Sequence, residues 1–325
     1  MAPADDGDRL IQEALAELGW DADSRKVAAQ VRRLDLGLPA EDQFVAICAW
    51  LGKSRLIHKL DQLQVPLTSR DEFQVPDLLA VFDGTGPVLV EVKAKSGDKL
   101  SFRPDYLEKL QAYAALVGMP LLIAWKYHGI WTLFDARHLK LARTNFNIRF
   151  AEAMAENVLG VLAGDVAYKI EPGAGLRFRC RKEELLSVER DGDQVTEHWQ
   201  MRIDQVGYCA AGGKPVQRID EDVATLFTTW DLEERQTHDD THVELAFVAG
   251  NEGMMFGHMA LTHLLNWTLP VGTTINWRHA IRRDSVVASM TNFADALVRG
   301  LEQNVVRTIL HQQPRTWPDF LPRPS

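Results

Sequence analysis

Apolar residues recur at helical spacing in the first fifty residues of the chain. The stretches 8–18, 24–35 and 40–51 each place apolar side chains three or four positions apart, as on one face of a helix. The run Leu36-Gly37-Leu38-Pro39 interrupts this pattern, and such residues usually mark the end of one helix or the start of the next. The pattern therefore predicts three helices, the last over residues 40–51.

From Gln74 onward the pattern changes to short runs rich in Val, Leu and Ile. The turn-forming stretch 83–87 separates two such runs, which predicts a β-hairpin. Residues 104–118 return to helical spacing and end at a glycine, and the stretches 120–126 and 129–134 read as two further strands. The order helix, hairpin, helix, strand, strand predicts a compact α/β unit.

Beyond residue 150 the pattern favours a helix to about residue 162 and then a strand-rich region. The predicted strands there are 165–171, 176–181, 185–190 and 195–208, with a turn at 191–193. Two later stretches, 254–266 and 286–311, have helical spacing, and the proline-rich end is predicted to be extended. The predicted domains are an N-terminal helical extension over 1–39, a core over 40–150, and an α+β domain of unknown role over 151–325.

Composition places the chain among ordinary globular proteins. Of its 325 residues, 46% are hydrophobic and 25% are charged, which excludes a fibrous or mostly disordered chain. No apolar run is long enough to span a membrane, and the acidic start lacks a secretory signal, so we expect a cytoplasmic protein without a membrane partner. Three scattered cysteines predict neither a disulfide framework nor a zinc site.

The net charge of −9 taken alone argues against a nucleic-acid partner, but the charge is unevenly distributed along the chain. Residues 1–51 carry 10 acidic and 5 basic side chains, residues 52–150 carry 10 and 14, and residues 151–325 carry 25 and 17. The middle segment is therefore a basic island in an acidic chain. An ordinary solvated surface would also account for so small a surplus.

The most informative residues lie in the predicted hairpin. Glu91 and Lys93 are two apart on the second strand, so their side chains point to the same face, and Asp77 heads the first strand. A hairpin centred on Thr85 would place Asp77 opposite Lys93 and diagonal to Glu91, with all three on one face. A slip of one residue would send Asp77 to the opposite face.

Two carboxylates and an ammonium between apolar strands are costly to bury unless they pair or bind a metal. Asp77, Glu91 and the carbonyl oxygen of Val92 offer the hard oxygen ligands that Mg²⁺ prefers, and Mn²⁺ would substitute. Lys93 would position a metal-activated water or stabilise developing charge on a phosphate. This set predicts phosphodiester hydrolysis. The alternative is a structural Glu91–Lys93 ion pair, with Asp77 capping a strand.

This part of the sequence resembles the PD-(D/E)xK nuclease superfamily. The resemblance rests on Pro76-Asp77, a hairpin and then Glu91-Val92-Lys93, followed by a helix and two strands. Within it, residues 40–140 are most similar to the archaeal-type Holliday-junction resolvases. The resemblance implies a restriction-endonuclease-like α/β core, a central mixed sheet flanked by helices, and adds Glu41 to the acidic metal site. An acidic first helical turn also has a simpler explanation in the helix dipole.

Further residues are candidates for the site or for DNA. The resemblance carries over Gln111 on the helix after the hairpin, for which a polar surface position is the alternative. Lys95, Lys99 and Arg103, on the loop leaving the Glu91 strand, would contact DNA phosphates. Lys126 would either contact a phosphate or sit at a solvated strand end.

The sequence therefore predicts a Mg²⁺-dependent endodeoxyribonuclease, for instance a defence or restriction-type effector. Junction resolution or DNA repair is the alternative, and a non-catalytic nucleic-acid-binding or assembly protein is an alternative of another class. RNA remains open as substrate. We expect a homodimer or higher homo-oligomer, and a regulatory ligand or protein partner at residues 151–325.

Overall fold

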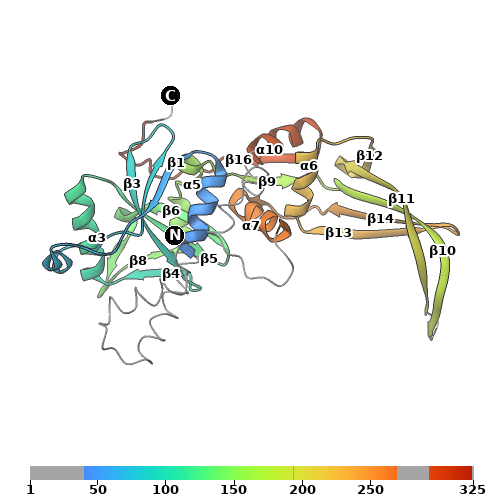
Figure 1. Cartoon of the computed structure of the whole chain (residues 1–325), viewed down its shortest axis with the longest axis horizontal. Helices are drawn as coiled ribbons and strands as arrows, with labels where there is room; N and C mark the ends of the chain where they lie inside the picture. The colour runs from blue at the N-terminus through green and yellow to red at the C-terminus, as the bar shows by residue number, and fades with distance from the viewer. Residues whose placement is uncertain (1–39, 193, 269–292, 324–325) are drawn as a thin grey trace, which may run out of the picture. The chain divides into compact units, whose positions relative to one another are not determined.

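The computed structural model describes residues 40–192, 194–268 and 293–323 (Figure 1). The helices predicted over 8–18 and 24–35 lie outside the described residues. Of the described chain, residues 40–165 and 312–323 form one compact unit, and residues 166–268 and 293–311 form a second. This division differs from the predicted one, which placed the boundary at residue 150 and the end of the chain in the second domain.

The first unit is built on a five-stranded mixed sheet. In spatial order its strands are β1 Ser54–Lys59, β2 Leu78–Phe82, β3 Pro87–Ala94, β5 Leu121–Tyr127 and β6 Ile130–Asp135. Neighbouring strands are antiparallel except β3 and β5, which run parallel and are connected through α3, Pro104–Val117. The predicted hairpin, helix and pair of strands are confirmed, whereas β1 was not predicted.

Alternating residues of β3 face two separate cores. Val90 and Val92 pack with residues of the helix over 40–51, including Phe44, and with Trp131. Leu89 points the other way, into a core that contains Leu107 of α3. The sheet is therefore covered on both faces, and Glu91 and Lys93 share the side of Leu89.

The hairpin register differs from the predicted one by two residues. Leu78 faces Val90 and Leu79 faces Leu89, so the hairpin is centred on Gly84 and not on Thr85. The reason is a tight turn in which the Thr85 amide donates to the Phe82 carbonyl, with Gly84 at a positive φ of 71°. A shift of two keeps the parity of the strand, so Asp77 stays on the predicted face.

Smaller elements complete the first unit. They are η1 Leu67–Asp71, β4 Lys99–Phe102, η2 Ala136–His138, β7 Lys140–Ala142, β8 Asn145–Arg149, α4 Phe150–Ala155 and α5 Leu159–Ala163. Strands β4, β8 and β7 form a sheet of their own. The helix predicted to about residue 162 is thus interrupted. In the gap, Asn157 Oδ1 accepts hydrogen bonds from the amides of Leu133, at 2.8 Å, and Leu159, at 3.1 Å.

Residues 312–323 contain no helix or strand, as predicted, but they belong to the first unit. Leu321 is buried in the core beneath the helix over 40–51, and Trp317 and Phe320 pack against the same core. The buried carboxylate of Glu156 accepts hydrogen bonds from Arg315 Nε and from the amide of Thr316. The end of the described chain is therefore an integral part of the first unit.

The second unit contains two sheets and several helices. A three-stranded sheet has the order β15 Met255–Phe256, β9 Ala167–Ile170 and β16 Val306–Leu310. The helices are α6 Glu221–Thr225, η4 Leu226–Thr229, α7 Gly257–Thr268 and α10 Phe293–Glu302. The prediction of one helix over 286–311 is wrong at its end, because the chain turns at Asn304, with a positive φ of 55°, and continues as β16.

The larger sheet of this unit is strongly elongated (Figure 1). Its order is β12 Lys214–Val216, β11 Gln194–Ala210, β10 Gly175–Asp191, β14 His242–Ala249 and β13 Leu232–His238, with η3 Ala211–Gly213 before β12. The predicted strands 176–181 and 185–190 are one continuous strand, β10. β14 pairs with β10 only up to Arg181, so the rest of β10 and its partner β11 form a two-stranded ribbon. No helix of the described residues is long and apolar enough to cross a membrane.

Candidate active site

Asp77 and Glu91 meet at the open end of the hairpin. Asp77 directly precedes β2, and extending the observed register by one pair places it opposite Glu91. Asp77 Oδ2 accepts a hydrogen bond of 2.7 Å from the amide of Val92. The Glu91 side chain is fully buried. Two carboxylates therefore converge where the sheet is covered.

One carboxylate oxygen of Glu91 accepts hydrogen bonds from two side chains, and the other accepts none among the described residues. Its Oε1 accepts from the ammonium of Lys93 and, at 2.5 Å, from the hydroxyl of Tyr106 in the first turns of α3. Lys93 also lies over the Tyr106 ring, 5.4 Å from its centre. Among the described residues Glu91 Oε2 has no hydrogen-bond partner, although it is buried. An unpaired buried carboxylate oxygen is costly, and a bound cation would satisfy it.

The charges of this group act strongly on one another. Burial raises the pKa of Asp77 well above its usual value, and the carboxylates of Glu91 and Glu41 raise it further, against the lowering effect of Lys93. Burial opposes the charge on Lys93, but Glu91 and Asp77 outweigh it and raise the pKa of Lys93. Burial and then Glu91 raise the pKa of Tyr106. The neighbouring carboxylates therefore favour the charged form of Lys93, and the environment of Tyr106 favours its protonated hydroxyl.

Glu41 lies at the start of the helix over 40–51, near this group. It pairs with Lys59 at 2.9 Å, and Lys59 also bridges to Asp42 at 2.5 Å. The structure does not bring Glu41 together with Asp77 and Glu91 as a metal site. Among the described residues, no group of three His, Cys, Asp or Glu side chains is placed to hold an ion. Asp77, Glu91 and the Val92 carbonyl still suit Mg²⁺, which takes few protein oxygens and completes its shell with water.

Lys126 has side-chain partners that the sequence did not indicate, and its contact with a phosphate stays a prediction. It is half-buried on β5, its ammonium contacts the buried amide oxygen of Gln43, and it lies 5.9 Å from the centre of the Trp131 ring. Burial lowers the pKa of Lys126. The side chain thus links β5 to the helix over 40–51 and does not sit at a solvated strand end.

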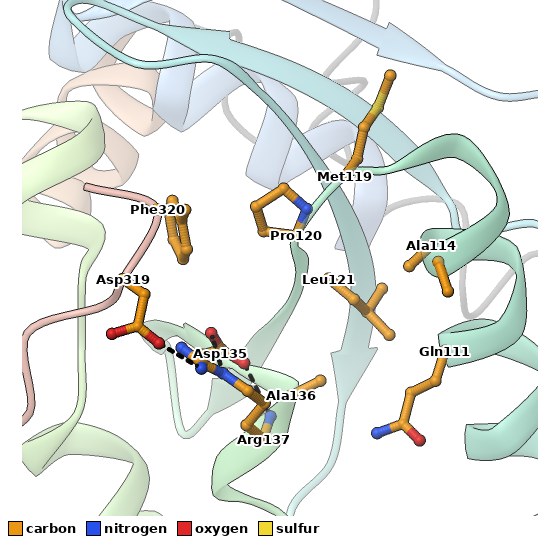
Figure 2. A pocket seen from close by; sticks show the side chains of 11 residues that line it. Gln111, Ala114, Met119, Pro120, Leu121, Asp135, Ala136, Arg137, Asp319 and Phe320 are labelled. Carbon is orange, nitrogen blue, oxygen red and sulfur yellow. Dashed lines mark hydrogen bonds and ion pairs between the residues drawn. The ribbon is translucent and has the colours of Figure 1, made fainter. Parts of the chain in front are cut away.

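Gln111 is not part of the acidic group. It lines a pocket of about 330 Å³ formed with residues after α3 and with Asp135, Arg137, Asp319 and Phe320 (Figure 2). The lining of this pocket includes none of Asp77, Glu91 and Lys93. Gln111 is exposed and lines a pocket that does not include these three residues, and its catalytic role stays a prediction.

The three remaining basic candidates are exposed, as a phosphate contact requires. Lys95 follows β3, with its amide bonded to the Lys126 carbonyl. Lys99 belongs to the short strand β4 and not to a loop, and Arg103 is the residue before α3, paired with Asp105 at 3.8 Å. All three come from the segment between the Glu91 strand and α3.

Sequence reasoning missed Tyr106, Lys59 and Gln43 as neighbours of the predicted residues. For Lys59 the only signal was its place in the basic middle segment, residues 52–150. The sequence gives no comparable indication for Tyr106, whose place depends on how α3 packs against β3.

Comparisons with known proteins place this geometry in context. Residues 67–162 match the family model described as archaeal Holliday junction resolvase (hjc). Among solved structures, the chain is similar to Hjc, a Holliday junction resolvase of Archaeoglobus fulgidus, with a sequence identity of 22% and a TM-score of 0.30. The similarity covers 35% of this chain and 89% of that chain. No curated protein matches the sequence significantly. The resemblance of this segment to the archaeal Holliday junction resolvases of the PD-(D/E)xK nuclease superfamily is thereby confirmed.

Proposed function

We propose that the protein is a Mg²⁺-dependent endodeoxyribonuclease whose active site is the group around Asp77, Glu91 and Lys93. The observation that carries the proposal is the buried Glu91, with one oxygen unpaired, facing Asp77 inside the segment that matches the resolvase family model. A purely structural Glu91–Lys93 pair would not require a second carboxylate at the same covered place, because an extra buried charge only adds cost.

Asp77, Glu91 and the Val92 carbonyl would hold the metal, with Glu41 joining them after release from Lys59. When bound, Mg²⁺ supplies Lewis-acid polarisation of a phosphoryl oxygen and a more acidic water. The carboxylates beside Lys93 favour its charged form, so it would donate to the negative charge that develops on the phosphate. Tyr106 holds Glu91 in place through its hydroxyl.

The DNA would lie along the basic side of the first unit. Lys95, Lys99 and Arg103 are exposed between β3 and α3 and would contact phosphates without reading sequence. The acidic surplus of residues 151–325 disfavours DNA over most of the second unit. A regulatory or targeting role suits that unit better, as in a defence or restriction-type effector.

Resolution of Holliday junctions is the second candidate, and the family-model match over residues 67–162 favours it. The two candidates differ in substrate and not in chemistry. A panel of linear duplex, supercoiled plasmid, single strands and a four-way junction, each with Mg²⁺, separates them, since a resolvase cuts the junction preferentially.

The control for the panel is a pair of isosteric variants in the same hairpin. We expect Asp77→Asn to abolish cleavage of every substrate, while Asp83→Asn, at the exposed turn, keeps the wild-type rate. Lys93→Met should lower the rate by roughly 100-fold or more, as removal of an electrostatic donor does in other enzymes. Full Mg²⁺-dependent cleavage by Asp77→Asn would refute the proposed site.

A further inference from the structure

The pocket that Gln111 lines has the size and composition of a small-molecule site. Its volume is about 330 Å³, and its apolar lining includes Met119, Pro120, Leu121 and Phe320 (Figure 2). Pockets that bind small molecules usually have volumes of about 300 to 1,000 Å³ and are mostly apolar, with a few convergent polar groups. All of its lining residues belong to the first unit.

Gln111 offers this pocket a hydrogen-bond donor and a hydrogen-bond acceptor. It lies on α3, and Figure 2 shows its side chain without a hydrogen bond to another residue of the lining. Nor does any other described residue pair with its amide. An amide of this kind can bind two atoms of one ligand at once, as Gln does with the amino group and a ring nitrogen of adenine.

The charged residues of the pocket carry a surplus of one negative charge. Arg137 Nε donates to Asp135 Oδ2 at 3.0 Å, and Arg137 Nη1 donates to Asp319 Oδ2 at 2.7 Å. Two carboxylates beside one guanidinium disfavour a phosphate group at this place. A purely aliphatic ligand fits no better, because it would displace water from the Gln111 amide without replacing its hydrogen bonds.

The opposite side of the pocket presents rings. Figure 2 shows Phe320 and Pro120 in the upper part of the view, with Gln111 and Arg137 below them. Nucleic-acid bases stack on aromatic side chains, because every base has a π-face. A flat heterocycle with polar atoms on its edge therefore matches both sides of the pocket.

We propose that this pocket binds an adenine ring, supplied as the free nucleoside and not as part of a strand. Gln111 would pair with the amino group and a ring nitrogen, and Phe320 would stack on the ring. A DNA strand or a nucleotide would bring phosphates towards Asp135 and Asp319, whereas a nucleoside brings none.

Binding would also hold together two parts of the first unit that are far apart in the sequence. Gln111 and Pro120 belong to residues 104–121, whereas Asp319 and Phe320 belong to residues 312–323, which follow the second unit. A ligand that contacts both parts stabilises, by mass action, the state in which they lie together. Adenosine would thus act on the completeness of the first unit.

Calorimetric titration of the full-length protein with adenosine tests the proposal. It needs neither DNA nor Mg²⁺, so its result does not depend on the proposed nuclease activity. We expect a dissociation constant below about 1 mM. Purine riboside, which lacks only the amino group, should bind roughly ten-fold more weakly. Adenosine 5′-monophosphate and a short oligo(dA) should also bind more weakly than adenosine.

Two variants assign the contacts. Gln111→Met removes the amide at similar size, so it should weaken adenosine binding roughly ten-fold and abolish the preference for adenosine over purine riboside. Gln200→Met, exposed in the second unit, is the matched control and should change neither. Phe320→Leu should weaken both ligands about ten-fold. Urea unfolding checks that the variants fold like the wild type.

Hydrogen exchange locates the ligand. Adenosine should slow exchange in residues 104–121 and 312–323 and leave the second unit unchanged. Absence of adenosine binding at about 1 mM would overturn the proposal, as would protection confined to the second unit. A preference for adenosine over purine riboside that survives Gln111→Met would also overturn it. Tighter binding of the monophosphate or of oligo(dA) would refute the choice of a free nucleoside.

Discussion

Asp77 occupies an environment in which its negative charge is unfavourable without a cation. When folding raises the pKa of a carboxyl group, the folded state binds the proton more tightly than the unfolded chain does. Stability from this group is therefore greatest at acid pH and is lost as the pH rises above the usual value of 3.8 and through the raised pKa of Asp77.

Asp77→Asn removes this penalty, since an amide cannot ionise and its oxygen can still accept from the Val92 amide. In metal-free solution we expect the variant to be more stable than the wild type by about 1 kcal/mol at neutral pH, a common price of active-site function. The difference should vanish at acid pH. Urea unfolding of both proteins across this pH range measures the difference in the free energy of unfolding. An Asp77→Asn variant that is less stable than the wild type at neutral pH would show that the buried charge of Asp77 is not unfavourable.

The hydroxyl of Tyr106 donates a hydrogen bond to Glu91. Tyr106→Phe keeps the ring beside Lys93 but removes the hydroxyl that donates to Glu91. We expect the Mg²⁺ concentration for half-maximal cleavage to rise by about ten-fold, the usual effect of losing a partner of a metal ligand. Tyr113→Phe, on the same helix, is the matched control, and an unchanged Mg²⁺ requirement in Tyr106→Phe would show that Glu91 needs no such support.

The chemistry of single residues was predictable where it depended on local pattern. Asp77, Glu91 and Lys93 share a face because side chains alternate along strands, and this was read from spacing alone. The partner of Lys126 was not predictable, because Gln43 is 83 residues away along the chain. The same holds for Lys59 and Glu41, which meet only after the helix over 40–51 packs on the sheet.

Among the elements, helices with clear ends were predicted well. α3 ends at Val117, before Gly118 in the left-handed conformation, as its sequence indicated. The hairpin register was missed by two residues because a backbone hydrogen bond within the turn, from Thr85 to Phe82, decides it. The strand β16 was missed because its apolar residues also fit helical spacing.

At the base of β10 the strands approach too closely for any side chain. A Cβ on Gly175 would lie 1.9 Å from the carbonyl oxygen of Phe247 on β14. Gly175→Ala should therefore destabilise the second unit by roughly 2 kcal/mol or more, because the backbone of β14 must move. Thermal unfolding measures this, with Gly207→Ala as control, since no atom lies within 4 Å of a Cβ there. Equal stability of the two variants would contradict the pairing at Gly175.

On the scale of the whole molecule, the path of the chain was the least predictable feature. The sequence predicted a core over 40–150 and an α+β domain over 151–325, but the return of residues 312–323 to the first unit depends on a few apolar contacts far apart in sequence. A proline-rich segment is expected to be extended whichever domain it packs against, so the sequence did not indicate the domain to which residues 312–323 belong.

Leu321 supplies the main apolar contact of this returning segment. It is 5% exposed in the core of the first unit, so Leu321→Ala should destabilise that unit by roughly 2 to 4 kcal/mol. Leu310→Ala, half-exposed in the second unit, should change stability little. Hydrogen exchange resolves the two units, and a loss of protection confined to the second unit in Leu321→Ala would be inconsistent with the structure.

The return of the chain also sets an order of events during synthesis. The ribosome makes residues 40–165 first, yet the core of the nuclease-like unit lacks Leu321 until the whole second unit has been translated. A chain released before residue 321 would carry Asp77, Glu91 and Lys93 on an incomplete core. The first unit would thereby be complete only after the second unit had also been made.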